Sequence, residues 1–280
     1  MDVVQFSDQY ALAAPLYEVS PGELRHRDEL RGQPMFRWLA VREGVAAAAV
    51  TALPRPDGRM FLSFVGEDHP ANGPLTVAAS DSLRQPLFTF VAADDRRRVA
   101  SLAMAGFETE LVEEQFRIRF ERALDLLDRA WLPSGFSIHR ADHVDEDRLF
   151  TLDNTLRQDT PGTDGWRGDR SWFQQEIATS PPFDSAAYLV AIDDSNGEYA
   201  GLVRVWRNPD GPRFGLIGVL PQYRNAPIAA ALLKQALAAA AGWGYDTFVA
   251  ETSLTNAVVY PRMKRLGAET LGRFLQMVHH

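Results

Sequence analysis

The sequence predicts an α/β (α+β) protein built from two tandem domains, each a mixed, mostly antiparallel sheet flanked by helices. Three observations lead to this class. Short apolar runs typical of strands are interleaved with segments of helical periodicity. Turn-forming residues separate neighbouring apolar runs. The same order of elements also occurs twice along the chain, which is the pattern of an internal duplication.

The first half begins with helical segments and continues with three apolar runs. Residues 7–31 have helical spacing, interrupted at Pro21-Gly22. Turn sequences separate the apolar runs that follow, so we expect an antiparallel meander. The predicted elements are strands at 35–41, 45–53 and 59–65, a helix at 75–83, a strand at 87–91, a helix at 96–105 that ends at Gly106, and a half-exposed strand at 113–121.

The second half repeats this order after a connector at 122–135. Its predicted elements are a strand at 136–140, helices at 144–156 and 170–177, a hairpin at 186–193 and 199–207, a strand at 214–220, a helix at 226–242, a strand at 247–251, a helix at 256–266 and a strand at 270–278. Two local matches align the halves: Asn72-Gly-Pro-Leu75 with Asn225-Ala-Pro-Ile228, and Leu102–Phe107 with Met263–Ala268. We therefore predict domains at 1–121 and 136–280.

Composition excludes several classes of function. With 46% hydrophobic and 24% charged residues, the 280-residue chain has an ordinary globular balance. Its net charge of −8 disfavours nucleic acid or an anionic membrane as the main partner. Because it has no cysteine, it has no disulfide, thiolate metal site or cysteine nucleophile. We expect no metal site from the histidines, no membrane span and a cytoplasmic location.

One stretch, residues 216–244, organises the second half. It combines an apolar strand, a polar turn and a long Ala/Leu helix whose first turn carries no acidic side chain. Free backbone N–H groups at a helix N-terminus form an anion site, so the stretch is a candidate for phosphate binding. The alternative is an ordinary strand–turn–helix unit of an α/β protein.

At Gly218-Val-Leu-Pro-Gln-Tyr-Arg224, and at Asn256 followed by Leu266-Gly267, the sequence resembles the GNAT superfamily of acyl-CoA-dependent N-acyltransferases. The resemblance covers 136–280, and a degenerate copy covers 1–121. It implies a sheet split into a V that holds the pantetheine arm of acetyl-CoA, the co-substrate, with its pyrophosphate on the turn after the fourth strand. The implied cofactor residues are Gly218, Val219, Leu220, Arg224, Asn225, Ala226, Pro227, Ile228, Ala229, Asn256 and Met263.

Two residues depart from the pattern of the resemblance. Pro227 stands where the family has glycine and lacks an amide hydrogen for the phosphates. Met263 stands where the family has its tyrosine general acid. Tyr260 lies one turn earlier on the same helix and is a substitute acid or a packing aromatic. Glu251, at the end of a strand, is a candidate base or a solvent-facing strand end.

The first half lacks the residues that the family uses for cofactor binding and catalysis, so we expect it to be structural or to shape the substrate site. Ala71 takes the place of the arginine, Asp95 that of the asparagine and Leu102 that of the tyrosine.

The resemblance implies direct acetyl transfer from the thioester to a small amine. Seven aspartates at 142–170 favour a cationic acceptor, unless they form a solvated face interleaved with arginines. The alternative function is a catalytically silent acyl-CoA or ligand-binding sensor or partner protein. We expect a monomer or a homodimer.

Overall fold

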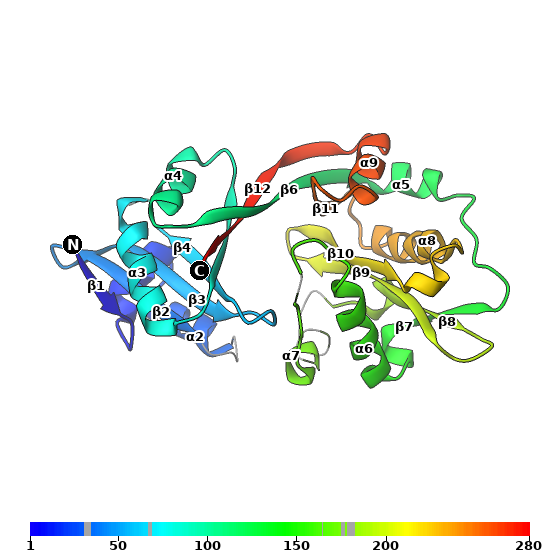
Figure 1. The fold of residues 1–280 in the computed structure, drawn as a ribbon, viewed down its shortest axis with the longest axis horizontal. Helices are drawn as coiled ribbons and strands as arrows, with labels where there is room; N and C mark the ends of the chain where they lie inside the picture. Colours follow the sequence, from blue (N-terminus) through cyan, green and yellow to red (C-terminus); the bar gives the residue numbers. More distant parts are fainter. Residues whose placement is uncertain (31–34, 67–68, 164, 175–176, 178–182) are drawn as a thin grey trace. The chain divides into compact units, whose positions relative to one another are not determined.

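The computed structural model describes residues 1–30, 35–66, 69–163, 165–174, 177 and 183–280 (Figure 1). These residues form two compact units. The first consists of Met1–Val112 together with Arg273–His280, and the second of Glu113–Gly272. Each is a mixed sheet flanked by helices, so the predicted fold class is confirmed.

The first unit contains a six-strand sheet in the order β1-β2-β3-β4-β5-β12. Neighbouring strands are antiparallel except for β4 and β5, which are parallel. The strands are β1 (Asp2–Gln5), β2 (Phe36–Arg42), β3 (Val45–Pro54), β4 (Met60–Val65), β5 (Leu87–Ala92) and part of β12 (Glu269–His279). The helices are α1 (Tyr10–Ala13), α2 (Pro21–Leu30), α3 (Asn72–Leu83) and α4 (Arg96–Met104), with short 3-10 turns η1 (Ala14–Tyr17) and η2 (His69–Ala71).

The second unit has the same layout, in the strand order β6-β11-β10-β9-β8-β7. Only β10 and β11 are parallel. The strands are β6 (Glu108–Arg119), β7 (Phe136–Arg140), β8 (Tyr188–Asp193), β9 (Tyr199–Asn208), β10 (Gly211–Val219) and β11 (Thr247–Ser253). The helices are α5 (Phe120–Leu126), α6 (Glu146–Arg157), α7 (Arg170–Gln174), α8 (Ile228–Ala241) and α9 (Val259–Arg265), with 3-10 turns η3 (Ala141–His143), η5 (Ser185–Ala187) and η6 (Pro221–Tyr223).

The final strands of the two halves are exchanged between the units. Residues 113–119 of β6 pair with β11, whereas residues 274–279 of β12 pair with β5. The units therefore differ from the predicted ranges 1–121 and 136–280, because each sheet is completed by a strand from the other half of the chain. The predicted connector 122–135 also contains most of α5, and β1 was not predicted at all.

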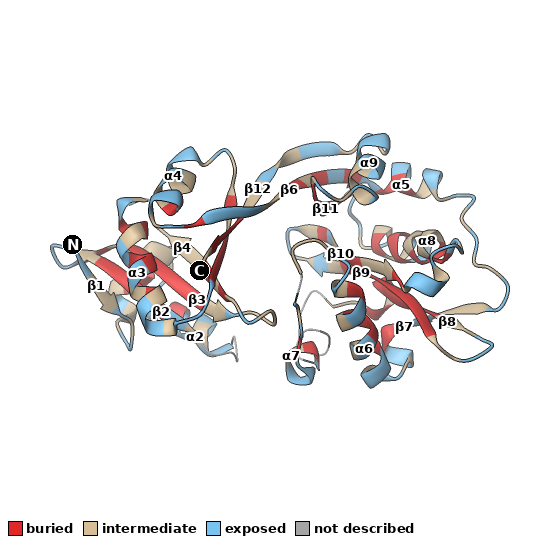
Figure 2. Ribbon diagram, in the orientation of Figure 1, coloured by how far each residue is buried: buried red, intermediate tan, exposed pale blue. Residues whose placement is uncertain are grey.

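Buried residues occur in the strands of each sheet and in the helices that flank them (Figure 2). In the second unit, α8 covers one face over a core that includes Val203, Leu232 and Phe248. Helices α6 and α7 cover the other face over Leu149, Phe173 and neighbouring residues. Among the described residues, no helix is both long and apolar enough to cross a bilayer.

Candidate functional site

The sheet of the second unit opens into a V between β10 and β11. The two strands pair at one position only, Arg213 with Val249. Beyond it, β10 stays paired with β9 as far as Val219, and β11 stays paired with β6 as far as Ser253. The carboxyl ends of two parallel strands are therefore separated, as the resemblance implied.

Backbone groups line both edges of this V. Leu220 N donates to Ala200 O at 2.8 Å, which marks the hydrogen-bonded pairs between β10 and β9. Because antiparallel pairs alternate, the N–H groups of Ile217 and Val219 point away from β9 and toward β11. Of the two neighbouring residues Val219 and Leu220, only Val219 has an N–H that faces the V, because the N–H of Leu220 is bonded to Ala200 O. The same alternation applies to β11 and β6, where Phe120 N donates to Asp246 O at 3.0 Å. The backbone N–H and C=O of Glu251 therefore point away from β6 and toward β10.

The turn after β10 presents unpartnered N–H groups. Within the described parts of the chain, the N–H groups of Asn225, Ile228, Ala229 and Ala230 donate no hydrogen bond. Those of Arg224 and Ala226 bond to Pro221 O and Tyr223 O. Pro227 is the N-cap of the 14-residue helix α8, with φ −75° and ψ 27°, and no acidic residue lies in its first turn. The free amides and the positive end of the helix dipole suit a phosphate group.

Arg224 is already occupied on two sides. Its Nε donates to Val219 O at 3.0 Å, and its guanidinium forms an ion pair with Asp159, which lies just after α6. Both side chains are about half exposed, so the pair is solvent-screened and weak. A phosphate at this turn would compete with the Asp159 carboxylate for the arginine.

Tyr223 is a residue of this turn that the sequence reasoning missed. Its hydroxyl oxygen lies 2.7 Å from Glu198 Oε2 and 3.0 Å from Asp193 Oδ2, so its single proton is shared between these two carboxylates. The Asn196 amide lowers the pKa of Tyr223, but these two carboxylates and burial outweigh it and raise that pKa to about 12. Tyr223 therefore stays protonated and ties the turn to the β8–β9 hairpin. Its place next to Arg224 in the sequence does not indicate these contacts.

Gly218 has a packing role. A Cβ atom there would lie 2.9 Å from Leu156 Cδ2 of α6, so only glycine lets that helix approach β10. On the facing strand, a Cβ at Gly201 would lie 2.6 Å from Gly218 O. The glycine that the resemblance assigned to the cofactor is thus required by the packing of α6.

Two further predicted cofactor residues lie on and before α9. Asn256 Oδ1 accepts from Val259 N at 2.9 Å and from Val258 N at 3.2 Å, so its oxygen holds the start of the helix. Met263 packs against the core that α8 covers. Its thioether fills space there and carries no exchangeable proton.

Glu251, the candidate base, has both carboxylate oxygens engaged. Oε1 accepts from Gln115 Nε2 at 2.7 Å, and Oε2 accepts from Arg213 at 2.6 Å. Its neighbours Phe248 and Ala250 belong to the core under α8. Since side chains alternate along a strand, Glu251 faces the opposite side of the sheet, toward α6.

Tyr260, the candidate acid, lies on the other face. It packs with the α8 core, and its hydroxyl donates to Glu114 Oε2 at 3.2 Å. Glu114 is opposite Thr252 on β11, in register with the core-facing residues Phe116 and Ala250. The candidate base and the candidate acid therefore lie on opposite faces of the sheet, Glu251 on the α6 side of β11 and Tyr260 on the α9 side, bonded to β6.

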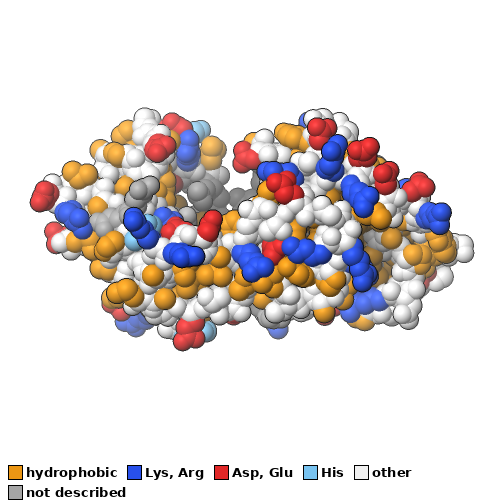
Figure 3. Space-filling view, turned by 90° about the horizontal axis from the view of Figure 1, so that it is seen from above, with side chains coloured by type: hydrophobic (Ala, Val, Ile, Leu, Met, Phe, Trp, Pro, Cys, Tyr) orange, Lys and Arg blue, Asp and Glu red, His pale blue; other side chains and the backbone are white. Residues whose placement is uncertain are grey.

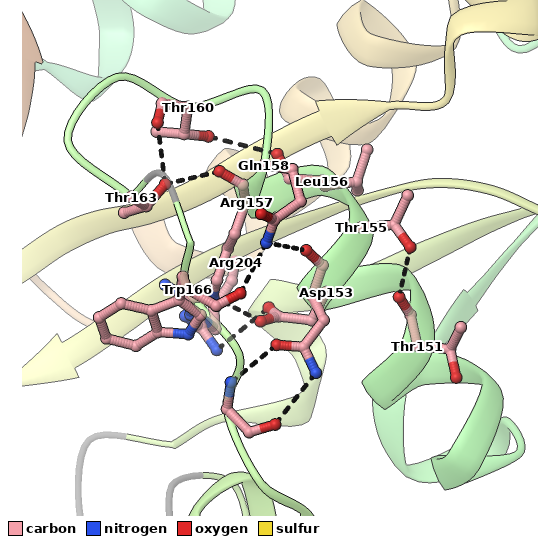
Figure 4. Close-up of polar contacts among 12 residues, drawn as sticks. Thr151, Asp153, Thr155, Leu156, Arg157, Gln158, Thr160, Thr163, Trp166 and Arg204 are labelled. Carbon is pink, nitrogen blue, oxygen red and sulfur yellow. Dashed lines mark hydrogen bonds and ion pairs between the residues drawn. The ribbon is translucent and has the colours of Figure 1, made fainter. Parts of the chain in front are cut away.

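The aspartates at 142–170 are committed to structural contacts. Asp145 and Asp169 accept hydrogen bonds from backbone N–H groups at the starts of α6 and α7. Asp142, Asp147 and Asp159 pair with arginines. Figure 4 shows Asp153 of α6 beside Arg157 and the buried Arg204 of β9. Asp164 lies outside the described residues. Among the described aspartates, the contacts favour arginine pairing and helix capping over an acceptor site for cations, although the buried Asp153 belongs to no solvated face.

In the first unit, the corresponding V contains an arginine. Strands β4 and β5 pair only from Met60 to Leu62 on β4, and Arg98 of α4 donates to Phe64 O and Gly66 O, each at 3.3 Å. The three residues predicted to replace the family's machinery have local roles. Asp95 caps α4 by accepting from Arg98 N, and Ala71 and Leu102 are fully buried.

Two surface features lie apart from the V. A hollow of about 620 Å³ is lined by residues of β6, α5 and the α9–β12 turn and reaches Thr247, the first residue of β11, whereas the V opens at the other end of that strand. On the face drawn in Figure 3, acidic and basic side chains are interspersed with apolar ones. That face shows no single basic patch.

Comparison with known proteins agrees with this geometry. Residues 149–268 match the model of the acetyltransferase (GNAT) family. A GCN5-related N-acetyltransferase from Sphaerobacter thermophilus is similar in structure, with a TM-score of 0.66, 15% identity, and coverage of 99% of this chain and 95% of that one. A tandem GNAT protein from the clavulanic acid biosynthesis pathway has a TM-score of 0.66, 16% identity, and coverage of 99% and 97%. A GCN5-related N-acetyltransferase from Kribbella flavida has a TM-score of 0.59, 13% identity, and coverage of 92% of this chain and 93% of that one. No curated protein matches the chain.

Proposed function

We propose, from the premise that residues 149–268 form an acetyltransferase domain of the GNAT family, that this chain transfers an acetyl group from acetyl-CoA to a small-molecule amine at the V between β10 and β11. The observation that carries this proposal is the presence of two sets of backbone donors on either side of one turn. The inward-facing N–H groups of Ile217 and Val219 precede the turn, and the free amides at the start of α8 follow it.

These groups fit the chemistry of acetyl-CoA. The amides of Asn225, Ile228, Ala229 and Ala230 would bind the pyrophosphate, with Arg224 beside them. The edges of β10 and β11 would hydrogen-bond the amide-containing pantetheine arm as an added strand does. Pro227 subtracts one donor from the turn, and Asn256 keeps its amide nitrogen for the ligand, because only its oxygen caps α9.

The two faces of the V divide the work of acyl transfer. The acceptor amine approaches on the α6 side, where Glu251 takes its proton. The amine nitrogen attacks the thioester carbon, and Val219 N–H stabilises the developing negative charge on the carbonyl oxygen. The C–N bond forms, the C–S bond breaks, and Tyr260 donates a proton to the departing sulfur on the α9 side. Arg213 must first leave Glu251, which its half-exposed position allows.

The acceptor is proposed as a small amine without further assignment of its charge, because the described aspartates of 142–170 are already paired or capping. The alternative function, a catalytically silent acyl-CoA binder or sensor, is favoured by Met263 at the family's tyrosine position and by the engagement of Arg224 with Asp159.

Two measurements test the proposal. We expect calorimetric titrations with acetyl-CoA, CoA and desulfo-CoA to show binding of all three. No heat or thermal shift at millimolar ligand would exclude both functions. With binding established, release of free CoA in the presence of a panel of amines would demonstrate the transferase, and release no faster than that without amine would favour the silent binder.

A further inference from the structure

A buried carboxylate lies on the α9 side of the V. Glu114 of β6 is 1% exposed, and three side chains donate to it. Tyr260 Oη is 3.2 Å from Oε2, Thr270 Oγ1 is 2.9 Å from Oε1, and Lys264 Nζ also contacts Oε1. Tyr260 and Lys264 are four residues apart on α9 and so share one face of that helix.

Packing alone does not require this cluster. Burying a carboxylate costs free energy that its partners only offset, and apolar residues of similar volume often stabilise as well or better. Ordinary core residues adjoin it: Phe116 lies two residues along β6, with its ring 6.0 Å from that of Tyr260. A charged group retained among such neighbours is a candidate for a chemical role.

The cluster links an exposed lysine to the candidate acid. The Lys264 side chain is 44% exposed, whereas that of Glu114 is almost completely buried. The hydrogen bond from Lys264 to Glu114 raises the pKa of Lys264, so the ammonium remains charged at neutral pH. Tyr260 is partly buried, packed against the α8 core with its hydroxyl on Glu114. The hydrogen-bonded order is therefore lysine, carboxylate, phenol.

We propose that Glu114 is the positioning residue for Tyr260, and that Lys264, Glu114 and Tyr260 form a proton path from solvent to the departing sulfur. The inference rests on the proposed function. Met263 cannot protonate the departing sulfur, and the proposal assigns this step to Tyr260, assisted by Glu114 and Lys264.

The protons balance along this path. As the C–S bond breaks, the Tyr260 O–H proton moves to sulfur, forming the thiol and leaving a phenolate. The Lys264 ammonium then loses one proton, which passes through the Glu114 carboxylate to the phenolate. Lys264 recovers a proton from water. No oxidant, reductant or metal enters the step.

This arrangement makes the site depend on the first half of the chain. Glu114 precedes the connector and reaches the second unit only because residues 113–119 pair with β11. A domain cut at residue 136 would retain Tyr260 and lose its hydrogen-bond acceptor.

A double-mutant cycle in the full chain tests the proposal, with Glu114→Gln, Tyr260→Phe and the double variant. We expect each single change to lower kcat by about 10- to 100-fold while leaving the Kd of acetyl-CoA unchanged. Because both residues act through the phenol, the double variant should be no slower than Tyr260→Phe. Lys264→Met should also lower kcat, and the matched control Lys234→Met should not, since Lys234 contacts only Asp128 O among the described residues. Losses that add, or a raised Kd with unchanged kcat, would overturn the proposal.

A comparison of CoA and desulfo-CoA binding tests the path without an acceptor, and so applies if the kinetic assay is not possible. CoA and desulfo-CoA differ only in the sulfur that Tyr260 is proposed to contact. We expect wild type to bind CoA with a Kd about fivefold lower than that of desulfo-CoA, which corresponds to the free energy of one hydrogen bond. Tyr260→Phe and Lys264→Met should each reduce that ratio. Equal preferences in wild type and both variants would refute the path, whereas no binding of either ligand would refute the proposed function itself.

Discussion

At the scale of single residues, the charged groups around the V differ in how readily they can exchange partners. Glu251 with Arg213, and Arg224 with Asp159, are ion pairs with exposed members. Pairs of this kind contribute only about 0–1 kcal/mol, so a substrate can replace one partner. Glu114 is held by three donors in a buried position and keeps them. In the proposed reaction, Glu251 and Arg224 therefore exchange partners to contact the substrates, whereas Glu114 stays in place and orients Tyr260.

The role of Glu251 is tested by Glu251→Gln. Because an amide cannot take the acceptor's proton, we expect kcat to fall about 100-fold, with little change in the Kd of acetyl-CoA. Steady-state kinetics and calorimetry measure the two quantities. Glu269→Gln is the matched control, since Glu269 pairs with Arg117 and lies outside the V. Full activity of Glu251→Gln would remove Glu251 as the base.

Pro227→Gly should tighten the binding of acetyl-CoA. The substitution restores an N–H group at the N-cap of α8 and removes a ring from the backbone that faces the phosphates. One recovered hydrogen bond corresponds to roughly a fivefold lower Kd. Calorimetry gives the value, and the same change at Pro54, in β3 of the first unit, serves as a control. An unchanged or higher Kd would mean that the phosphates do not lie against residue 227.

At the scale of elements, the segment 158–163 after α6 contacts the turn that follows β10. The segment is held to α6 by Thr163 Oγ1, which donates to Arg157 O at 2.6 Å, and it places Asp159 against Arg224. The same helix packs Leu156 against Gly218. Helix α6 and the segment after it thus contact, respectively, the strand and the turn that would receive acetyl-CoA.

Asp159→Asn should increase the affinity for acetyl-CoA and for CoA. The change removes a negative charge next to the phosphates and releases Arg224 from an ion pair of about 1 kcal/mol, which corresponds to about a fivefold lower Kd. Asp147→Asn is a matched control, because Asp147 pairs with Arg170 on α7. Weaker binding by Asp159→Asn would indicate instead that Asp159 holds Arg224 in its binding position.

At the scale of the whole molecule, each sheet contains a final strand from the other half of the chain. The edge of β11 is completed by residues 113–119, and the edge of β5 by residues 274–279. Cutting the chain between the repeats leaves an uncovered sheet edge in each piece. Such edges promote aggregation.

Fragments test this organisation directly. We expect residues 113–272 to fold and to unfold cooperatively, since they contain every strand that pairs around the V. Residues 136–280 lack the partner of β11 and should aggregate or unfold at a lower temperature. Circular dichroism and size-exclusion chromatography distinguish these outcomes. Equal stability of the two fragments would show that β6 contributes little to the second unit.

Local patterns in the sequence predicted the order of elements, and the family resemblance carried by the 216–244 stretch, Asn256 and Leu266-Gly267 implied the location of the V. Apolar runs, turn residues and helix-ending glycines depend on neighbouring residues, so the fold class and the strand–turn–helix at 216–244 could be predicted. The turn's departure from the family pattern, Pro227, was also visible. The start of α5 and the short edge strand β1 were missed because each is brief and has weak periodicity.

Only the tertiary structure decided which final strand completes which sheet and which side chains meet. Residues 113–121 and 270–278 both follow a helix that ends in glycine, and either could pair with β5 or β11, since strand pattern does not specify a partner. Glu114 and Tyr260 are separated by 146 positions. Their contact follows from the long-range pairing of β6 with β11, and no local spacing in the chain encodes it. The ion pairs of Glu251 and Arg224 likewise join residues far apart in the sequence.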